Sequence, residues 1–224
     1  MREYGLGRLP SPRDPRDFLM ADAVRELEKG LVPRPVKRWA SKKVLDQGTA
    51  PTCVGHAWAG WGIAEPVEDP WCDLTARDIY RACKALDGNN EPGSTVRSGA
   101  KVMTRRDNVK TYFFAASVDE ALDYLARFGT VVFGTVWTQG MFKPSLIGKV
   151  IRPTGPVKGG HAWLALGVDS RYVTIRNSWG TDWGKGGEAR ISLADLKAIW
   201  KQGGEACAAT ERALPIGGTD ATTA

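Results

Sequence analysis

The spacing of hydrophobic and polar residues changes along the chain from a helical period to a strand period. In residues 52–65, apolar side chains from Val54 to Trp61 recur at the i, i+3, i+4 and i+7 positions of a helix that faces a core. Further helices are predicted over residues 21–29, 75–86, 118–128 and 195–200. Helices therefore dominate the first part of the sequence.

The second part of the sequence has the pattern of strands. Residues 130–137, TVVFGTVW, are dense in β-branched and aromatic side chains, which predicts a buried strand. Residues 161–168 and 172–176 are predicted to form two strands joined by a short turn at Asp169 and Ser170. Helices followed by a β-rich half indicate an α+β fold.

The ends of the chain differ in composition from its middle. Residues 1–20 are rich in Pro, Arg and Asp and are expected to run extended over a surface. We predict an extended N-terminal segment with a short helix in residues 1–35, a single domain in 36–212 and a flexible tail in 213–224. Within the domain, the polar, glycine-bearing stretch 87–98 is expected to be a loop.

The helix predicted over residues 52–65 places a cysteine where it can react. Thr52 is a good N-cap, so Cys53 falls in the first helical turn, and Pro66 marks the end of the helix. The partial positive charge there favours a thiolate, and free backbone N–H groups can meet a developing oxyanion. The glycines of this helix weaken its propensity, so burial or close approach by large neighbours must hold it.

The predicted hairpin supplies a base for this cysteine. A three-residue loop at 168–170 pairs residues whose numbers sum to 338, which places His161 opposite Asn177; a two-residue loop leaves them neighbours. An asparagine oxygen can then accept from one imidazole nitrogen and leave the other for Cys53. His56, at i+3 from Cys53, is the alternative base, but it lies a turn deeper and no orienting partner is evident for it.

Two stretches, LDQGTAPTCVGHAW and GGHAWLALGVD…YVTIRNSWGTDWGKGG, resemble the signature regions of the papain family of cysteine peptidases. The resemblance, to a compact bacterial or phage type, covers about residues 36–191. It implies an N-terminal helical lobe packed on a C-terminal antiparallel β-sheet or barrel lobe, with the active site between them. It also implies that Cys53, His161 and Asn177 form a catalytic triad.

The same resemblance assigns roles to residues around the triad. Gln47 matches the glutamine that completes the oxyanion hole, and Trp179 matches the tryptophan that shields the His–Asn hydrogen bond from water. Gly93 and Ser94 are similar in position to the glycine-bearing segment that pairs with the substrate backbone.

Some positions depart from the family pattern. Ala50 and Val54 stand where the family has a cysteine and an aromatic residue, so the disulfide of that cysteine is not expected. The stretch between Cys53 and His161 is shorter than the ~130–150 residues typical of papain-type enzymes, which predicts trimmed loops. The 46 residues before Gln47 are too few for a large inhibitory propeptide. We therefore expect residues 1–35 to lie along the enzyme and partly cover its groove.

The function implied is hydrolysis of peptide bonds in a protein or peptide substrate through an acyl-enzyme, with no metal and no organic cofactor. Two alternatives stay open from the sequence. One is cleavage of an amide in peptidoglycan. The other is a papain-like module that serves as a structural part of a larger assembly such as a phage particle.

Composition excludes several other classes. The net charge is +6, but Lys and Arg are scattered, so no nucleic-acid partner is expected. No run approaches the ~20 apolar residues of a membrane span, and the charged, proline-bearing N-terminus predicts no signal peptide. We expect a cytoplasmic or phage-virion location without membrane contact. Cys72, Cys83 and Cys207 are expected to be small hydrophobic residues rather than part of a disulfide framework or zinc site.

Overall fold

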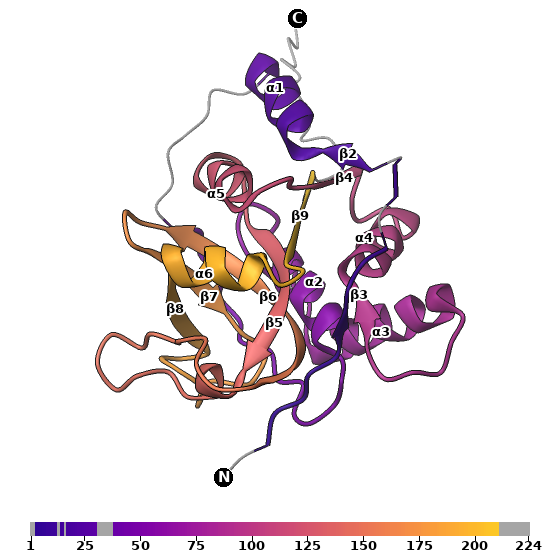
Figure 1. Cartoon of the computed structure of the whole chain (residues 1–224). Coiled ribbons are helices and arrows are strands. Elements are labelled where there is room, and N and C mark those ends of the chain that lie inside the picture. The colour runs from indigo at the N-terminus through magenta and orange to yellow at the C-terminus, as the bar shows by residue number, and fades with distance from the viewer. Residues whose placement is uncertain (1–2, 13, 16, 31–37, 211–224) are drawn as a thin grey trace, which may run out of the picture.

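A computed structural model describes residues 3–12, 14–15, 17–30 and 38–210 (Figure 1). The helices are α1 (Met20–Gly30), α2 (Cys53–Ile63), α3 (Asp73–Asp87), α4 (Val96–Arg105), α5 (Val118–Arg127), α6 (Leu193–Trp200) and the short 3-10 helix η1 (Gln139–Phe142). The strands are β1 (Arg8–Leu9), β2 (Phe18–Leu19), β3 (Ser94–Thr95), β4 (Thr111–Phe114), β5 (Val131–Thr138), β6 (Val157–Val168), β7 (Tyr172–Arg176), β8 (Glu188–Ser192) and β9 (Glu205–Thr210). The predicted α+β class is confirmed, and the predicted tail 213–224 lies outside the described residues.

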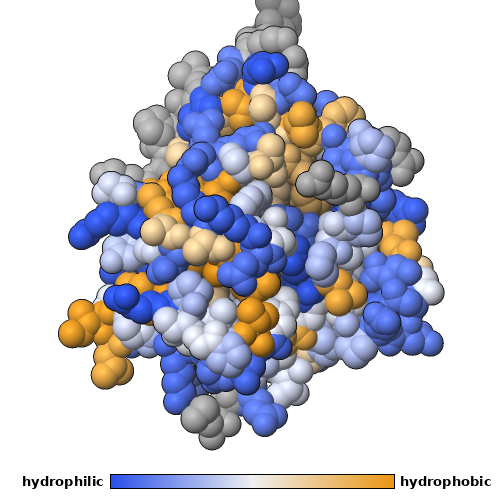
Figure 2. Space-filling model, in the orientation of Figure 1, coloured by the Kyte–Doolittle hydropathy of each residue, from blue (hydrophilic) through white to orange (hydrophobic). Residues whose placement is uncertain are grey.

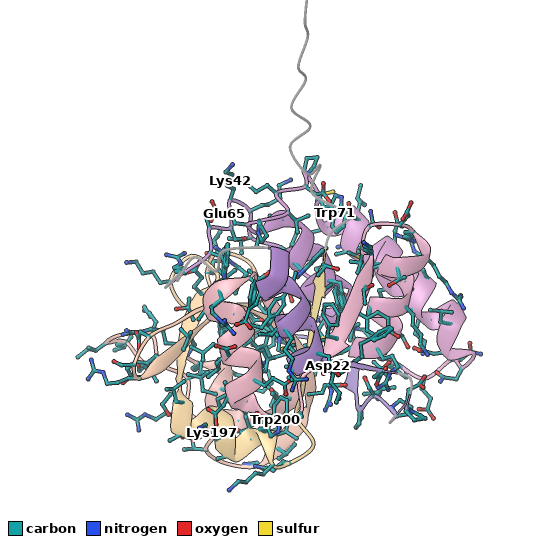
Figure 3. The ribbon with its side chains drawn as sticks, turned by 90° about the horizontal axis from the view of Figure 1, so that it is seen from above. Asp22, Lys42, Glu65, Trp71, Lys197 and Trp200 are labelled. Carbon is teal, nitrogen blue, oxygen red and sulfur yellow. The ribbon has the colours of Figure 1, made fainter. Side chains whose placement is uncertain are left out.

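Seven strands form one mixed sheet in the order β2-β4-β9-β5-β6-β7-β8, and β1 pairs with β3 in a separate parallel ribbon. Alternate residues of the central strands face two different cores: Phe133 packs on the β-rich side and Val132 on the helical side. In the view of Figure 3, Trp71 and Trp200, from these two sides, lie at opposite edges of the molecule. The central strands therefore separate the β-rich half from the helical half and contribute side chains to the cores of both.

Helix α2 lies buried between these strands and α3, and its glycines are what allow this. A Cβ on Gly55 would lie 2.2 Å from the carbonyl oxygen of Ala76 in α3, and one on Gly62 would lie 2.2 Å from the ring of Trp71. The close approach expected from the glycine content is confirmed. The N-cap role of Thr52 is wrong in part, because Thr52 occupies that position but its side chain makes no capping hydrogen bond.

The expectation of a loop over residues 87–98 is wrong at its end, where β3 and then α4 begin. The Thr95 hydroxyl accepts from the Ser98 backbone N–H at 2.9 Å and caps the new helix. Burial of Val96 and Met103 against the helical core holds α4 in place.

The predicted hairpin register is also wrong. Residues 164–165 pair with 175–176, and residues 167–168 pair with 173–174, around a β-bulge. The Asp169 carboxylate accepts the backbone N–H groups of Arg171 and Tyr172 at 2.7 and 2.8 Å, so the turn closes later than predicted. The backbones of His161 and Asn177 are therefore not directly opposite.

The described part of the N-terminus runs extended, as predicted, and crosses the boundary between the two halves (Figure 1). It pairs twice in parallel, β1 with β3 and β2 with β4. Buried Arg97 of α4 fixes it further, with its Nε 3.1 Å from Asp17 Oδ1. The N-terminal segment is thus held to the rest of the fold by two strand pairs and by this side-chain contact.

The face in Figure 2 is largely hydrophilic, with hydrophobic residues in separate groups. The most exposed large apolar side chains are Leu146 and Ile147, between η1 and β6. Across the described ranges, no helix has the length and apolar character needed to cross a bilayer.

Candidate active site

Cys53 is the first residue of α2, and its side chain is completely buried. Burial raises the pKa of the thiol to about 11, although the backbone N–H groups of Ala162, Gly7 and Val54 act in the opposite direction. The prediction of a lowered thiol pKa is therefore wrong for this form. The helix N-terminus is in place, but the covered sulfur loses more from desolvation than it gains from the nearby dipoles.

His161 lies in β6 directly before Ala162, whose N–H approaches the sulfur, and the ring is held by Asn177. The distance between His161 Nε2 and Asn177 Oδ1 is 2.8 Å. Asn177 Oδ1 also accepts from the Ser178 backbone N–H at 2.8 Å, so this oxygen faces the ring and Nε2 must donate. Among the described residues His161 Nδ1 has no hydrogen-bond partner, which leaves it free to accept a proton.

Burial lowers the pKa of His161 to about 4; the Asn177 hydrogen bond opposes this shift, and the charge of His56 adds to it. An imidazole with this pKa is neutral at neutral pH, and a thiol with a pKa of about 11 is protonated. In this form the Cys53 thiol and the His161 imidazole are therefore both uncharged at neutral pH.

Trp179 covers the His161–Asn177 hydrogen bond from one side. Its indole stacks on the His161 ring at a centroid distance of 4.7 Å, and Phe142 stacks on the indole in turn at 5.5 Å. Trp137 meets the edge of the imidazole at 4.7 Å. The histidine thus lies in an aromatic enclosure that keeps water from its bond to Asn177.

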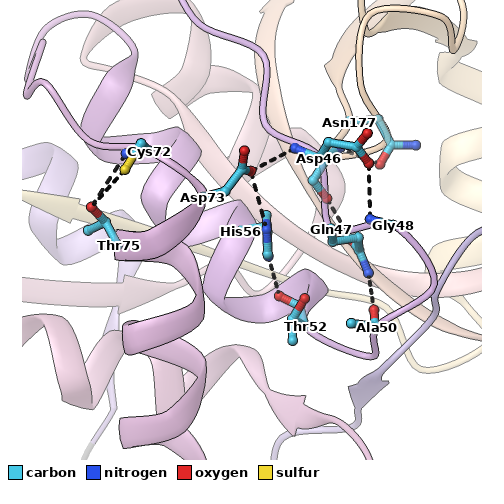
Figure 4. A network of polar contacts seen from close by, with 11 residues as sticks. Asp46, Gln47, Gly48, Ala50, Thr52, His56, Cys72, Asp73, Thr75 and Asn177 are labelled. Atoms are coloured by element: carbon cyan, nitrogen blue, oxygen red, sulfur yellow. Dashed lines mark hydrogen bonds and ion pairs between the residues drawn. The ribbon is translucent and has the colours of Figure 1, made fainter.

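Gln47 is positioned by the residues that follow Asn177. Its backbone N–H donates to the Ser178 carbonyl at 2.9 Å, and its Oε1 accepts from the Ser178 hydroxyl at 2.7 Å. The side-chain NH₂ is thereby turned outward, where it donates to the carbonyl of Ala50 at 2.7 Å (Figure 4) and to that of Gly5 at 3.1 Å. An amide N–H aimed at a carbonyl oxygen is what an oxyanion hole requires.

One of the carbonyls that Gln47 binds, that of Gly5, belongs to the N-terminal segment of the chain. Residues 4–8 cross the site: the Gly5 N–H donates to the Gly48 carbonyl at 3.0 Å, and the Gly7 N–H donates to the Gly160 carbonyl at 3.1 Å. Tyr4 stacks on Trp179 at 4.5 Å. The N-terminal stretch therefore lies in the groove that we expected it to cover.

Gly93 and Ser94 lie on the other side of this stretch. The Ser94 N–H donates to the Gly7 carbonyl at 2.8 Å, and a Cβ on Gly93 would lie 2.4 Å from that oxygen. Both residues thus meet the protein's own extended backbone in this form, and their pairing with a substrate stays a prediction.

His56, the alternative base, faces away from this arrangement. Its Nδ1 lies 2.9 Å from the Thr52 carbonyl and its Nε2 lies 3.5 Å from Asp73 Oδ1 (Figure 4). The Asp73 carboxylate also accepts from the Asp46 N–H at 2.7 Å, and His56 is the main cause of its lowered pKa. The absence of an orienting partner was a wrong expectation, since a carboxylate from α3 fills that role.

The groove continues beyond Tyr4 as an open cavity of about 940 Å³. It is lined partly by Gln139, Phe142, Lys143 and Lys158. No cluster of three or more His, Cys, Asp or Glu side chains that could hold a metal occurs within the described ranges, and all four cysteines are free thiols.

Solved structures with similar backbones are cysteine proteases. Xylellain, a cysteine protease from Xylella fastidiosa, superposes with a TM-score of 0.69 at 19% identity over 95% of this chain and 98% of its own. Procathepsin B S9 from Trypanosoma congolense gives 0.60 at 12% identity over 93% and 83%. Digestive procathepsin L2 proteinase from Tenebrio molitor gives 0.57 at 14% identity over 92% and 78%.

The chain has the papain-like fold. No protein-family model matches the sequence, and a search of curated proteins gave no match. The likeness to these papain-like proteins is thus one of structure, and the chemistry must be argued from the site.

Some residues of this papain-like site were missed from the sequence. Ser178, which fixes both Gln47 and Asn177, follows Asn177 directly and was readable as a second polar partner there. The spaced glycines Gly5 and Gly7 signalled close backbone approach. The contact of Arg8 with Glu205 had no local signal, because 197 positions separate the two residues.

Proposed function

We propose that this chain is a papain-like cysteine endopeptidase in which Cys53 is the nucleophile, His161 the base and Asn177 the residue that orients the base. The observation that carries the proposal is the His161 ring, which donates through Nε2 to Asn177 and keeps Nδ1 unpartnered beside the start of α2. A neutral imidazole in this tautomer has one purpose-built acceptor for a thiol proton.

The reaction follows from these positions. His161 Nδ1 takes the Cys53 proton, and the sulfur attacks the substrate carbonyl carbon. The resulting oxyanion receives N–H donors from Gln47 Nε2 and the Cys53 backbone at the N-terminus of α2. Collapse of the tetrahedral adduct expels the amine, which takes the proton from His161, and water then releases the acyl group by the same route.

The covered form is not productive. Residues 4–8 are bound to two sides of the site, through the Gly5 N–H to the Gly48 carbonyl and through the Gly7 N–H to the Gly160 carbonyl. A substrate must displace residues 4–8 before it reaches Cys53. Exposure of the site then admits water and lowers the desolvation penalty on the thiolate and the imidazolium.

A fluorogenic peptide library tests the proposal. Wild type should cleave members of the library, and Cys53→Ala should lose all activity, whereas Cys72→Ser serves as the matched thiol control and should retain it. A thiol-directed epoxide should label Cys53 and stop turnover. Equal activity of wild type and Cys53→Ala would remove the basis for a thiol peptidase.

Cleavage of peptidoglycan amides and a structural role in a phage particle stay predictions from the sequence, as does a bacterial or phage origin. Digestion of purified wall peptides beside casein separates the first from peptide-bond hydrolysis in proteins. Release of fragments from wall peptides alone would replace the proposed substrate class.

A further inference from the structure

The loop between η1 and β6 presents two adjacent aliphatic side chains to solvent. Leu146 is 90% exposed and Ile147 is 91% exposed, whereas Leu74, the next most exposed large apolar side chain of the described residues, is 66% exposed. Figure 2 shows hydrophobic residues at the lower left edge of the molecule, where this loop projects in Figure 1. Single exposed apolar residues are common on proteins, but two neighbours at a projecting tip mark a candidate contact surface.

The two aliphatic side chains are held at the tip by a closed turn. The Ser145 N–H donates to the Val150 carbonyl at 2.8 Å, and the Ser145 hydroxyl accepts from the Val150 N–H at 2.9 Å and donates to the Ile147 carbonyl at 2.6 Å. Gly148 turns the chain with a φ of 71°, and its carbonyl accepts from Arg190 Nε of β8 at 3.1 Å. The side chains at the tip therefore cannot fold back onto the protein without breaking these bonds.

The tip is surrounded by positive charge. Lys143 and Lys149 flank it in the sequence, and Arg152 follows on the exposed side of the next stretch. Residues 124–168 contain no Asp or Glu. Within the described part of the chain, these three cations form no ion pair. A partner that fits this loop is thus apolar where it meets the tip and negatively charged around it.

An anionic lipid bilayer has this combination of properties. Side chains that are nine-tenths exposed form a projection and not a groove, so a protein partner needs an apolar pocket of the opposite shape. Fluid acyl chains accommodate a projection without such a pocket. The lysine stems can lie along the apolar tip while their ammonium groups meet lipid phosphates. Shape and charge together therefore favour a lipid surface over a protein surface.

We infer that residues 143–150 form a membrane-contact loop, in which Leu146 and Ile147 enter the acyl region of an anionic bilayer and Lys143 and Lys149 contact its phosphates. The sequence predicts a location without membrane contact because it has no spanning segment, but contact through a surface loop requires none. Phe142 and Lys143 also line the open cavity at the end of the groove. Binding through the loop therefore keeps that end of the groove beside the lipid surface.

Cosedimentation of the full chain with vesicles tests the role of the aliphatic tip. Vesicles of phosphatidylcholine and phosphatidylserine in equal parts should bind the wild type at physiological ionic strength. Leu146→Ser with Ile147→Ser should lower the partition coefficient by about 30-fold or more, because the two aliphatic side chains no longer leave water. Leu74→Ser, at an exposed leucine of α3, is the matched control and should bind as wild type does.

The same measurement tests the role of charge. Vesicles of phosphatidylcholine alone should bind the wild type at least about tenfold more weakly than the mixed vesicles. Lys143→Gln with Lys149→Gln should weaken binding to the mixed vesicles by about tenfold, and added salt should do the same to the wild type. Arg105→Gln with Arg106→Gln removes the same charge from the exposed end of α4 and should have a smaller effect, since these side chains lie away from the loop.

Folding and catalysis are controlled separately. The loop variants should melt at the wild-type temperature, because the replaced side chains lie at the surface. Cys53→Ala should bind vesicles as wild type does, so a failure of the peptidase proposal leaves this inference standing. Vesicle binding that persists in Leu146→Ser with Ile147→Ser shows adsorption by charge alone and overturns the inference. A wild type that stays in solution with every vesicle also overturns it, and light scattering then shows whether the loop instead joins two copies of the chain.

Discussion

The chain contains only two histidines, both buried beside the start of α2, and the difference between them shows what makes a base. His56 has its Nδ1 hydrogen-bonded at the Thr52 carbonyl, and its Nε2, which makes no hydrogen bond, lies 3.5 Å from the Asp73 carboxylate. His161 has one nitrogen on Asn177 and the other without a partner among the described residues. A carboxylate neighbour looks like the stronger activator, but in His56 the carboxylate faces the one ring nitrogen that the Thr52 carbonyl leaves open.

The partners of the two histidines also differ in charge, which affects whether each ring can change its protonation state. A carboxylate beside a histidine stabilises its charged form, whereas the neutral amide of Asn177 orients the ring without fixing a charge on it. The His161 ring can therefore change protonation state during a reaction, and the His56–Asp73 pair is suited to a constant structural role that joins the starts of α2 and α3.

Replacing each histidine by asparagine should separate their roles and give the largest expected effect on kcat/KM. We expect His161→Asn to lower kcat/KM by at least about 10³-fold, because both proton transfers pass through this ring. His56→Asn should keep kcat/KM near that of wild type while lowering the melting temperature. Both variants are assayed with one fluorogenic peptide and by thermal unfolding. Activity kept in His161→Asn and lost in His56→Asn reverses the assignment.

Removing the contacts that hold residues 4–8 over the site should raise the rate at which the Cys53 thiol reacts. Tyr4→Ala with Arg8→Ala removes the stacking on Trp179 and the ion pair with Glu205, both of which hold the segment over Cys53. The double variant should react with iodoacetamide about tenfold faster or more at neutral pH, since the thiol pKa falls when water reaches it.

The matched control for this labelling is Arg25→Ala, an exposed change on α1 away from the groove. It should label at the wild-type rate. Labelling of Cys53 is followed by mass spectrometry beside that of Cys83, which is buried in the structure. A double variant that labels no faster than wild type shows that the segment does not control access.

The pKa of His161 also predicts how stability depends on pH. Its folded pKa is about 4 against an ordinary value of 6.5, so below pH 6.5 the unfolded chain binds more protons than the folded one. The contribution is fully present above pH 6.5 and is lost as pH falls toward 4, by about 3 kcal/mol over that window.

Denaturant unfolding at pH 4.5 and 7 measures this loss in wild type and in His161→Gln, which cannot titrate. The slope should be shallower in His161→Gln. The Cys53 thiol acts at the opposite end: its pKa is raised from 9.0 to about 11, so its contribution is present below pH 9 and is lost as pH rises toward 11. Equal pH dependence of wild type and His161→Gln contradicts the buried neutral imidazole.

Much of the fold, but not its covered state, could be predicted from the sequence. Helix α2 and strands β5 to β7 follow from local periodicity, because their apolar residues face a core directly. The hairpin register was missed because one side chain, Asp169, lengthens the turn, yet His161 and Asn177 still meet because a side-chain hydrogen bond tolerates a shift that backbone pairing does not. Domain boundaries drawn from composition stay predictions.

The state of the thiol was missed for a different reason. Its predicted pKa came from the helix N-terminus, which is a local feature, whereas burial, the largest cause of the shift in the folded chain, depends on tertiary packing. The local sequence pattern therefore predicts the helix dipole at Cys53, but it does not predict that residues 4–8 lie over the site. The same holds for Arg8 and Glu205, whose pairing depends wholly on tertiary structure.

The smallest expected effect belongs to Asp73→Asn, which tests the structural role of the second histidine. Asp73 keeps a lowered pKa chiefly through His56, so its contribution is present above its ordinary pKa of 3.8 and is lost as pH falls below it. At neutral pH we expect a melting temperature lower by about 2–4 °C and a kcat/KM close to wild type. Asp119→Asn, at an exposed acid, should change neither quantity. A large loss of kcat/KM in Asp73→Asn would show that His56 and Asp73 support the chemistry, and the difference between the partners of the two rings would no longer identify the base.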